Sequence, residues 1–246
     1  MEFLVCISKS PDTTTKIGFT ADGKSLDESG VQFIINPYDE WYALVRAIEL
    51  VEKNGGSVTT VMVGEADCDP IIRKALAIGA NKGIRVNAAP LDAAQVAGEI
   101  ANVAKAGTYD AILCGKETID HNSGVVPGMV AELLDLPLVT WVTSLEYDGD
   151  KPTMKRETVN GIETVTVDGP YVLSASKGMA EQRIPNMRGI MGARSKPLDV
   201  VEPCGSVAMT SVEAFALPPA KSGVKLVDAD NPAELVRLLR EEAKAI

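Results

Sequence analysis

The stretch from Gly115 to Val126 (GKETIDHNSGVV) comes closest in this sequence to a ligand-binding motif. Gly115 and Gly124 would let the backbone approach a ligand closely, and Ser123 offers a hydroxyl just before an expected helix. The glycines are not followed by G-K-[ST], and G-x-G-x-x-G does not occur in the sequence. The stretch therefore fits either a loop that holds a phosphate on backbone N–H groups or an ordinary helix start.

The sequence lacks an obvious catalytic set. His121 is its single histidine, so no histidine–cysteine cluster could bind zinc, and an exposed loop histidine is the simpler interpretation. Of the four cysteines, Cys6 and Cys114 lie in apolar segments, where buried inert thiols are expected. A Ser–His–Asp arrangement stays open, although no G-x-S-x-G elbow supports it. We therefore expect a chain that binds and presents something without bond chemistry of its own.

Residues 178–198 (GMAEQRIPNMRGIMGARSKPL) form a second unusual stretch. It combines glycine, methionine and basic side chains with a single acid, Glu181, in a chain of formal net charge −10. Its spacing shows neither the helical nor the strand period, so we expect an irregular loop. Its exposed-looking apolar side chains are Ile184, Met187, Ile190 and Met191. The loop is either a docking segment or a merely solvated basic surface.

The elements that would position these residues alternate between strand and helix over the first two-thirds of the chain. Strands are expected at 3–7, 31–35, 57–64, 83–86 and 109–115, and helices at 37–54, 70–79, 92–106 and 128–136. This alternation predicts a doubly wound, mainly parallel α/β sheet of the Rossmann-like type. Such sheets bind ligands beyond the carboxyl ends of their strands. The loops expected to form the site are 8–16, 36–39, 63–69 and 115–126.

The helix expected at 37–54 has both a start and a stop signal. Asn36 can cap it, and Pro37 suits its first position. Asp39 and Glu40 lie where the helix dipole is positive, and Gly55 ends the helical pattern. These signals place Asn36 to Asp39 at the carboxyl edge of the predicted sheet.

The predicted secondary structure changes after residue 137. β-rich runs are separated by Asn-Gly and Asp-Gly pairs, which are hairpin signals and predict an antiparallel addition to the sheet. Beyond 198 the chain is irregular until a final helix that Asn231 can cap, with one apolar face formed by Leu235, Leu238 and Leu239. We expect a nucleotide-binding domain at 1–198 and a C-terminal arm at 199–246 that wraps a partner.

Composition limits the classes of partner. The chain is 46% hydrophobic but only 4% aromatic, which suits an aliphatic core around a parallel sheet. The acidic balance argues against nucleic acid and anionic membranes as main partners. No apolar run approaches the roughly 20 residues that span a bilayer. A strand almost from Met1 leaves no room for a signal peptide, so we expect a reduced, cytoplasmic location.

Five segments in order resemble the β-subunit of electron-transfer flavoprotein. They are LVCISKSPDT, NPYDEWYALVRAIEL, IRKALAIGA, LCGKETID and EQRIPNMRGIMGARSKPL, the last after the strand YVLSAS. The resemblance implies an electron carrier, not an enzyme, paired with an α-subunit that binds most of the FAD. It implies transfer from acyl-CoA or other flavin dehydrogenases, as in fatty acid oxidation, to a quinone reductase. Neither nucleic acid nor membrane insertion is implied.

The resemblance also implies a nucleotide pocket in this chain. The common type of β-subunit holds AMP there as a structural ligand, and the electron-bifurcating type holds a second FAD that NADH reduces. The pocket positions carried over are Cys6, Asn36, Pro37, Tyr38, Asp39, Val63, Gly115, Asp120, His121, Asn122, Ser123, Gly124, Val125 and Val126. Tyr38 stands where the family has an aromatic residue near the flavin of the α-subunit.

The loop after Gly115 departs from both types of the family. AMP-binding members often read Asp-Asp-Asp-Cys-Asn-Gln-Thr and bifurcating members Asp-Gly-Asp-Thr-Ala-Gln-Val, where residues 120–126 here read Asp-His-Asn-Ser-Gly-Val-Val. The first Asp is kept and the Gln is lost in either comparison. We expect AMP, because Val125 and Val126 add no side-chain hydrogen bonds for a longer ligand. A stand-alone nucleotide-hydrolysing enzyme and a nucleotide sensor remain the rival functions.

The resemblance gives a function to the basic loop as well. In the family this loop docks the partner dehydrogenase by inserting one apolar side chain, and the ungapped match from Glu181 to Met191 places that anchor at Met187. The family usually has leucine there, and methionine keeps the length and apolar character. Ile184 belongs to the same docking segment. Arg183 and Arg188 are expected to steer the loop toward acidic rims.

Overall fold

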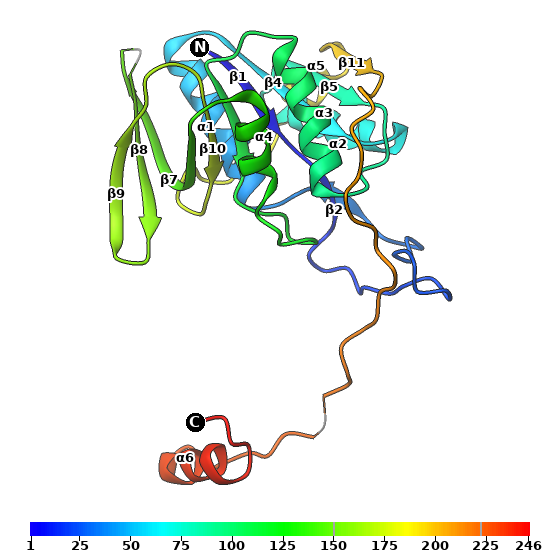
Figure 1. The fold of residues 1–246 in the computed structure, drawn as a ribbon, viewed down its shortest axis with the longest axis vertical. Coiled ribbons are helices and arrows are strands. Elements are labelled where there is room, and N and C mark those ends of the chain that lie inside the picture. The colour runs from blue at the N-terminus through cyan, green and yellow to red at the C-terminus, as the bar shows by residue number, and fades with distance from the viewer. Residues whose placement is uncertain (150, 222) are drawn as a thin grey trace.

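A nine-stranded sheet forms the centre of the computed structural model, which describes all residues except 150 and 222 (Figure 1). The order across the sheet is β11-β5-β4-β1-β6-β10-β7-β8-β9. The strands are β1 Glu2–Cys6, β4 Ser57–Val63, β5 Lys82–Val86, β6 Ala111–Gly115, β7 Leu138–Asp148, β8 Lys151–Thr158, β9 Gly161–Thr166, β10 Tyr171–Ala175 and β11 Leu198–Val201. Pairing is parallel from β11 to β7 and antiparallel from β7 to β9. The predicted fold class is confirmed.

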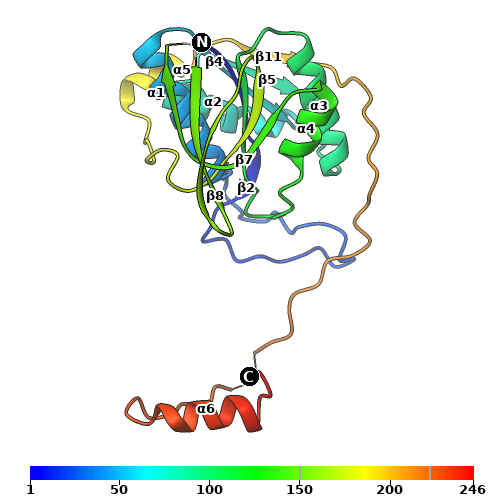
Figure 2. The same ribbon diagram turned by 60° about the vertical axis from the view of Figure 1, so that its left-hand side comes forward.

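Helices cover both faces of the parallel part of the sheet. Phe3 and Val5 belong to one core and Leu4 and Cys6 to the other, because successive strand side chains point to opposite faces. The first core includes buried residues of α1 (Asp39–Asn54) and α2 (Asp69–Ile78). The second includes those of α3 (Ala93–Lys105) and α4 (Val126–Leu134). Figure 2 shows the sheet between these layers.

The predicted start of α1 is wrong by two residues, although its predicted end at Gly55 is confirmed. The helix begins at Asp39, and Tyr38 precedes it with a φ of 66°. None of the described side chains caps this helix start, so Asn36 is not its cap and Pro37 is not its first residue. The chain turns sharply at Tyr38 because Asn36 is buried and bonded to another loop.

The sequence placed β10 among the β-rich runs of the antiparallel addition, and this prediction is wrong. It lies between β6 and β7 and pairs with both in parallel. The antiparallel region consists of β7, β8 and β9, and the predicted hairpin at Asn160–Gly161 joins β8 to β9. The turn between β7 and β8 includes residue 150, which lies outside the described residues. The Asn-Gly signal thus located its hairpin, whereas the Asp-Gly pair at 168–169 does not join paired strands, because β10 pairs with β6 and β7 and not with β9.

The segment 178–198 contains a short helix, where we predicted only an irregular loop. Helix α5 (Met187–Ala193) starts where the Asn186 side chain accepts a hydrogen bond from Gly189 N at 2.8 Å. A Cβ on Gly189 would lie 2.3 Å from the Ala77 carbonyl oxygen, so the glycine lets α5 approach α2 closely. The next element, β11, joins the edge of the sheet beside β5 and crosses the expected boundary at 198.

The C-terminal arm is fastened to the sheet domain before it extends away. The buried Glu99 of α3 accepts hydrogen bonds from Cys204 N at 2.8 Å and Ser206 N at 3.0 Å. Further on, Phe215 stacks on Phe19 with ring centroids 5.0 Å apart. Beyond this point the arm leads to α6 (Pro232–Glu241), which stands apart from the sheet in both ribbon views (Figures 1 and 2).

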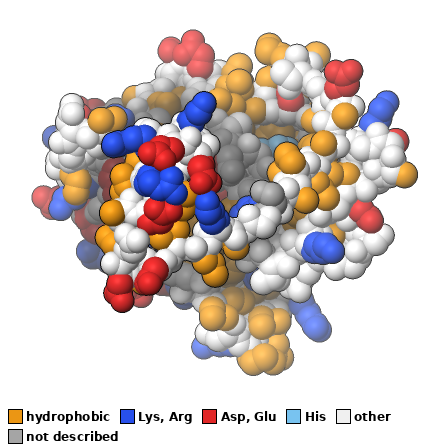
Figure 3. Space-filling view, turned by 90° about the horizontal axis from the view of Figure 1, so that it is seen from below, with side chains coloured by type: hydrophobic (Ala, Val, Ile, Leu, Met, Phe, Trp, Pro, Cys, Tyr) orange, Lys and Arg blue, Asp and Glu red, His pale blue; other side chains and the backbone are white. Residues whose placement is uncertain are grey.

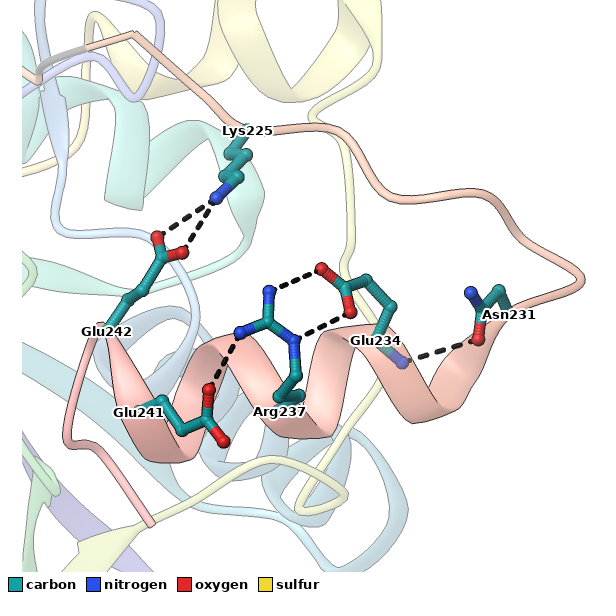
Figure 4. Close-up of polar contacts among 6 residues, drawn as sticks. All are labelled: Lys225, Asn231, Glu234, Arg237, Glu241 and Glu242. Atoms are coloured by element: carbon teal, nitrogen blue, oxygen red, sulfur yellow. Dashed lines mark hydrogen bonds and ion pairs between the residues drawn. The ribbon is translucent and has the colours of Figure 1, made fainter.

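Helix α6 is organised by its own polar contacts (Figure 4). Asn231 accepts a hydrogen bond from Glu234 N, as predicted for its cap. Arg237 pairs with Glu234 and with Glu241, both at 2.7 Å. Of its predicted apolar face, Leu238 is buried but Leu235 is 48% exposed. Leu239 is half-buried, so the helix covers only part of its apolar face.

Candidate functional site

Three neighbouring strands end at one edge of the sheet and bring the candidate site together. Cys6 ends β1, Val63 ends β4 and Gly115 ends β6, and β1 lies between the other two. All three residues are buried. The loops after β1 and β4 are in contact, because Lys9 pairs with Asp67. The ends of these strands therefore meet at the carboxyl edge of the sheet, where the sequence predicted the site.

Asn36 connects the segment before α1 to the loop after β6. It is fully buried, and its Oδ1 accepts a hydrogen bond from Ile119 N at 3.3 Å. Its Nδ2 has no hydrogen-bond partner among the described residues. A buried polar atom without a partner is costly and usually marks a missing water or ligand group. Asn36 thus offers an amide donor to something that the chain itself does not supply.

The acidic pair at the start of α1 behaves differently at its two positions. Asp39 is largely buried, and burial raises its pKa while the nearby Lys116 ammonium opposes the shift. Glu40 is buried more deeply, and its carboxyl accepts hydrogen bonds from Ser8 N at 2.7 Å and from the Ser8 hydroxyl at 2.9 Å. Burial raises the pKa of Glu40 to about 8 despite these bonds. Sequence reasoning assigned Glu40 only to the helix dipole and missed this contact.

The loop from Lys116 to Val125 contains tight turns, and its second half is exposed. His121 N donates to the Thr118 hydroxyl at 3.3 Å and to Asp120 Oδ1 at 3.1 Å, which makes a tight turn. Asn122 and Gly124 both have positive φ, at 50° and 63°. The His121 side chain is 74% exposed and lies 3.8 Å from Asp120. No contact among the described residues indicates a catalytic role for it.

The start of α4 carries the features expected of an anion site. Val125 precedes the helix, and no described side chain caps the first turn. Pro127 lies in that turn and has no N–H, so the donors there are those of Val126 and Gly128. Ser123 and Val125 are exposed beside it. Free N–H groups at the positive end of a helix can hold one phosphate without a lysine or a metal ion.

The cysteines beside the site are protected rather than reactive. Cys6 and Cys114 lie on adjacent strands and are both buried. A hydrogen bond with Cys114, together with burial, raises the pKa of the Cys6 thiol well above its usual value. The thiol therefore stays protonated and inert. No group of three or more potential metal ligands was found among the described residues.

One predicted site residue, Tyr38, lies on the surface. Tyr38 is 54% exposed, and its unusual backbone angles direct the chain into α1. Pro37 is buried beside it. The structure thus brings the ends of three strands, Asn36, Asp39 and the 116–126 loop to one edge, while the tyrosine remains on the surface there.

The segment 178–198, which we expect to be a docking segment, lies on a different part of the molecule, against α2. Ile184 and Met187 are 82% and 72% exposed. Arg183 makes a bidentate pair with Glu52 at 2.8 and 2.9 Å, so its charge is already matched within the chain. Arg188 is exposed. Of the two arginines expected to steer a partner, Arg188 is thus the more available.

The base of this segment is held firmly while its apolar side chains project outward. Arg73 donates to the carbonyl oxygens of Ala193 and Lys196 at 2.8 and 2.6 Å. Lys196 in turn donates to the carbonyl oxygens of Leu76 and Ala80 at 2.8 and 2.6 Å. A cavity of about 260 Å³ opens beside Ile184 and Gly189. These contacts fix the base of an exposed apolar surface.

Comparisons with known proteins agree over nearly the whole chain. The family model described as "Electron transfer flavoprotein domain" matches residues 24–205. The electron transfer flavoprotein subunit beta of Bacillus subtilis is 35% identical, with 100% of both chains covered. That of Syntrophomonas wolfei is 38% identical over 93% of this chain and 90% of its own, and the human protein is 32% identical over 98% and 97%. No described helix is long and apolar enough to cross a membrane.

Proposed function

This chain belongs to the electron transfer flavoprotein family as a β-subunit, and we propose that it is one half of a heterodimer that carries electrons from flavin dehydrogenases to a quinone reductase. Full-length similarity to proteins named as β-subunits is the observation that carries this proposal. The α-subunit supplies the FAD that takes and gives electrons. The free cysteines fit a reducing location, which we take to be the cytoplasm.

We further propose that the carboxyl edge of the sheet binds AMP as a structural ligand. The unpartnered Nδ2 of Asn36 supports this, since it can donate to an adenine nitrogen or a ribose oxygen. The uncapped start of α4 fits one phosphate on its backbone N–H groups. Val125 and Val126 add no polar side chain for a pyrophosphate, which favours AMP over a second FAD. AMP would stabilise the fold here and take no part in electron transfer.

The nucleotide content of the purified heterodimer tests this proposal. Acid denaturation followed by chromatography should release one AMP and one FAD per heterodimer, and NADH should not reduce the flavin. Two FAD and no AMP would overturn the AMP proposal and make this a bifurcating protein. The isolated chain should hydrolyse neither ATP nor AMP; ligand-dependent hydrolysis by a stable monomer would favour the stand-alone enzyme. Failure to co-purify with any flavoprotein would favour a nucleotide sensor.

The docking segment is proposed to contact the dehydrogenase. Its apolar side chains Ile184, Met187 and Met191 are all at least 70% exposed. Exposed apolar groups on an anchored segment are typical of a transient interface, where one side chain enters a pocket on the partner. The segment lies on α2, away from the start of α4, so dehydrogenase docking and nucleotide binding are separable functions.

A further inference from the structure

Glu40 joins two of the loops that form the proposed nucleotide site. Its carboxyl accepts both the N–H and the hydroxyl of Ser8, the second residue after β1. Its other side is pressed against the end of β6, where a Cβ on Gly115 would lie only 2.8 Å from Glu40 Cγ. Gly115 is the last residue of β6, and the proposed nucleotide loop starts directly after it. Glu40 therefore lies between the loop after β1 and the residue from which the proposed nucleotide loop starts.

The charges around Glu40 are mainly negative. Asp39 on α1 and Asp120 on the 116–125 loop both disfavour a charge on Glu40. Lys116 is the nearby basic group, but it acts on Asp39 and pairs with Glu117 at 3.0 Å. The titratable groups that face Glu40 or its neighbour Asp39 are Cys6, Lys116, Glu117 and Asp120. An ionised Glu40 would be a third carboxylate at a site proposed to hold an anion.

We propose that Glu40 is a positioning residue for the nucleotide. It holds Ser8 beside Gly115 through its hydrogen bonds, and it helps to retain the nucleotide by staying uncharged. This inference rests on the proposed nucleotide site. A neutral carboxyl adds no further repulsion toward the phosphate. The Ser8 hydroxyl serves either form, since it can accept from a carboxyl O–H or donate to a carboxylate. Nucleotide release therefore becomes faster when Glu40 loses its proton.

Titration of Glu40 can be distinguished from titration of the ligand, because the two groups lose their protons in different pH ranges. Burial raises the pKa of Glu40 to about 8. The second pKa of a phosphate monoester is about 6, so the ligand keeps its charge between pH 7 and 9. In that range the release rate of bound nucleotide from the purified heterodimer should rise roughly threefold to tenfold with pH. The readout is released nucleotide, separated by chromatography at timed intervals.

Two substitutions at Glu40 distinguish its charge from its hydrogen bonds. Glu40→Gln keeps an acceptor for Ser8 N–H and cannot ionise, so release should stay slow and independent of pH. Glu40→Ala removes the tie, so release should be fast at every pH. Glu49→Gln is the matched control, because it removes the same charge from a more exposed position on α1 and should behave as the wild type. A Glu40→Gln heterodimer whose release still rises with pH would overturn the inference.

Ser8→Ala provides a second test if the Glu40 variants do not fold. The Ser8 hydroxyl favours the charged carboxylate, so its removal should shift the rise in release rate to higher pH. An unchanged midpoint would contradict the role of Glu40. The proposed function fails separately, and first, if the wild-type heterodimer carries no nucleotide. A wild type that carries nucleotide but releases it at one rate from pH 7 to 9 overturns the role of Glu40 alone.

Discussion

Gly115 lies where a strand end meets the start of a helix, and no side chain fits there. A Cβ at this position would be 2.8 Å from the backbone nitrogen of Glu40 and 3.2 Å from the carbonyl carbon of Asp39. The backbone of α1 cannot move aside as a flexible side chain can. We expect Gly115→Ala to lower the free energy of unfolding by about 1–3 kcal/mol, measured by urea denaturation.

Gly192→Ala is the matched control for that substitution. Gly192 lies in α5, and a Cβ there would meet nothing within 4 Å. Alanine is a better helix former than glycine, so the free energy of unfolding should stay unchanged or rise by up to about 1 kcal/mol. Equal losses of stability in both variants would show that the lack of space for a Cβ does not explain the glycine at position 115.

Glu40 should make the stability of the protein depend on pH. Its pKa is raised from 4.5 to about 8 in the folded chain, mainly by burial, so the folded state binds more protons than the unfolded state between these values. The stability linked to this group is fully present below about pH 4.5 and is lost as pH rises through 8. The melting temperature of the wild type should therefore fall relative to that of Glu40→Gln from pH 5 to 8.5. Parallel curves for the two proteins would show that Glu40 does not titrate in this range.

At the scale of elements, the docking segment presents two candidates for the anchoring side chain. The family resemblance indicated Met187, while the structure exposes Ile184 more, at 82% against 72%. Helix α5 and its anchors to α2 hold both in place. We expect Ile184→Ala and Met187→Ala each to slow electron transfer from the dehydrogenase at least several-fold, since truncating a buried anchor costs about 1–2 kcal/mol or more.

The control for the docking segment is another exposed methionine. Met209 is 84% exposed but lies in the arm beside α3. Met209→Ala should leave transfer from the dehydrogenase unchanged, and all three variants should keep their nucleotide and FAD. If transfer is normal in both Ile184→Ala and Met187→Ala, the segment does not dock the dehydrogenase through these side chains.

Two carboxylates attach the arm to α3: the buried Glu99, and Asp92, which accepts hydrogen bonds from Met209 N and Thr210 N. Burial acts to raise the pKa of Glu99, but the N–H donors of Cys204 and Ser206 outweigh it and lower the pKa. A Glu99→Ala variant would leave these donors without their partner and free the segment around 202–206. We expect limited proteolysis of this segment to become several-fold faster than in the wild type. Equal cleavage rates would mean that Asp92 and the Phe19–Phe215 stack hold the arm alone.

Local signals in the sequence located most elements because each signal acts on its nearest neighbours. Gly55, Gly79 and Asn231 end or begin helices through the backbone of the same helix, and all three predictions were confirmed. The insertion of β10 between β6 and β7 depends on pairing between distant segments, which no local pattern encodes. For the same reason the sequence did not show that Asn36 bonds Ile119 or that Glu40 bonds Ser8.

At the scale of the whole molecule, the sheet domain buries its own core, whereas the arm leaves several of its apolar side chains exposed. Met209, Val224 and Leu226 are each more than 80% exposed along the arm. Hydrophobic side chains also remain uncovered beside charged ones on the face seen from below (Figure 3). A lone chain gains nothing from holding such side chains in water. We therefore propose that another chain, the α-subunit, covers the arm.

Removing the last part of the arm should separate assembly from folding. Deleting residues 229–246 takes away α6, whose Leu235 and Val236 are 48% and 45% exposed. Covering the remaining half of each side chain would contribute about half of the roughly 1.5–3 kcal/mol that full burial gives. We expect the truncated chain to capture much less α-subunit in a pull-down, with the urea unfolding transition of the sheet domain unchanged. Replacing Leu235 and Val236 together by serine should give the same loss, whereas Arg240→Ser on the same helix should not. If the truncated chain captures as much α-subunit as the full chain, the arm does not hold the heterodimer together.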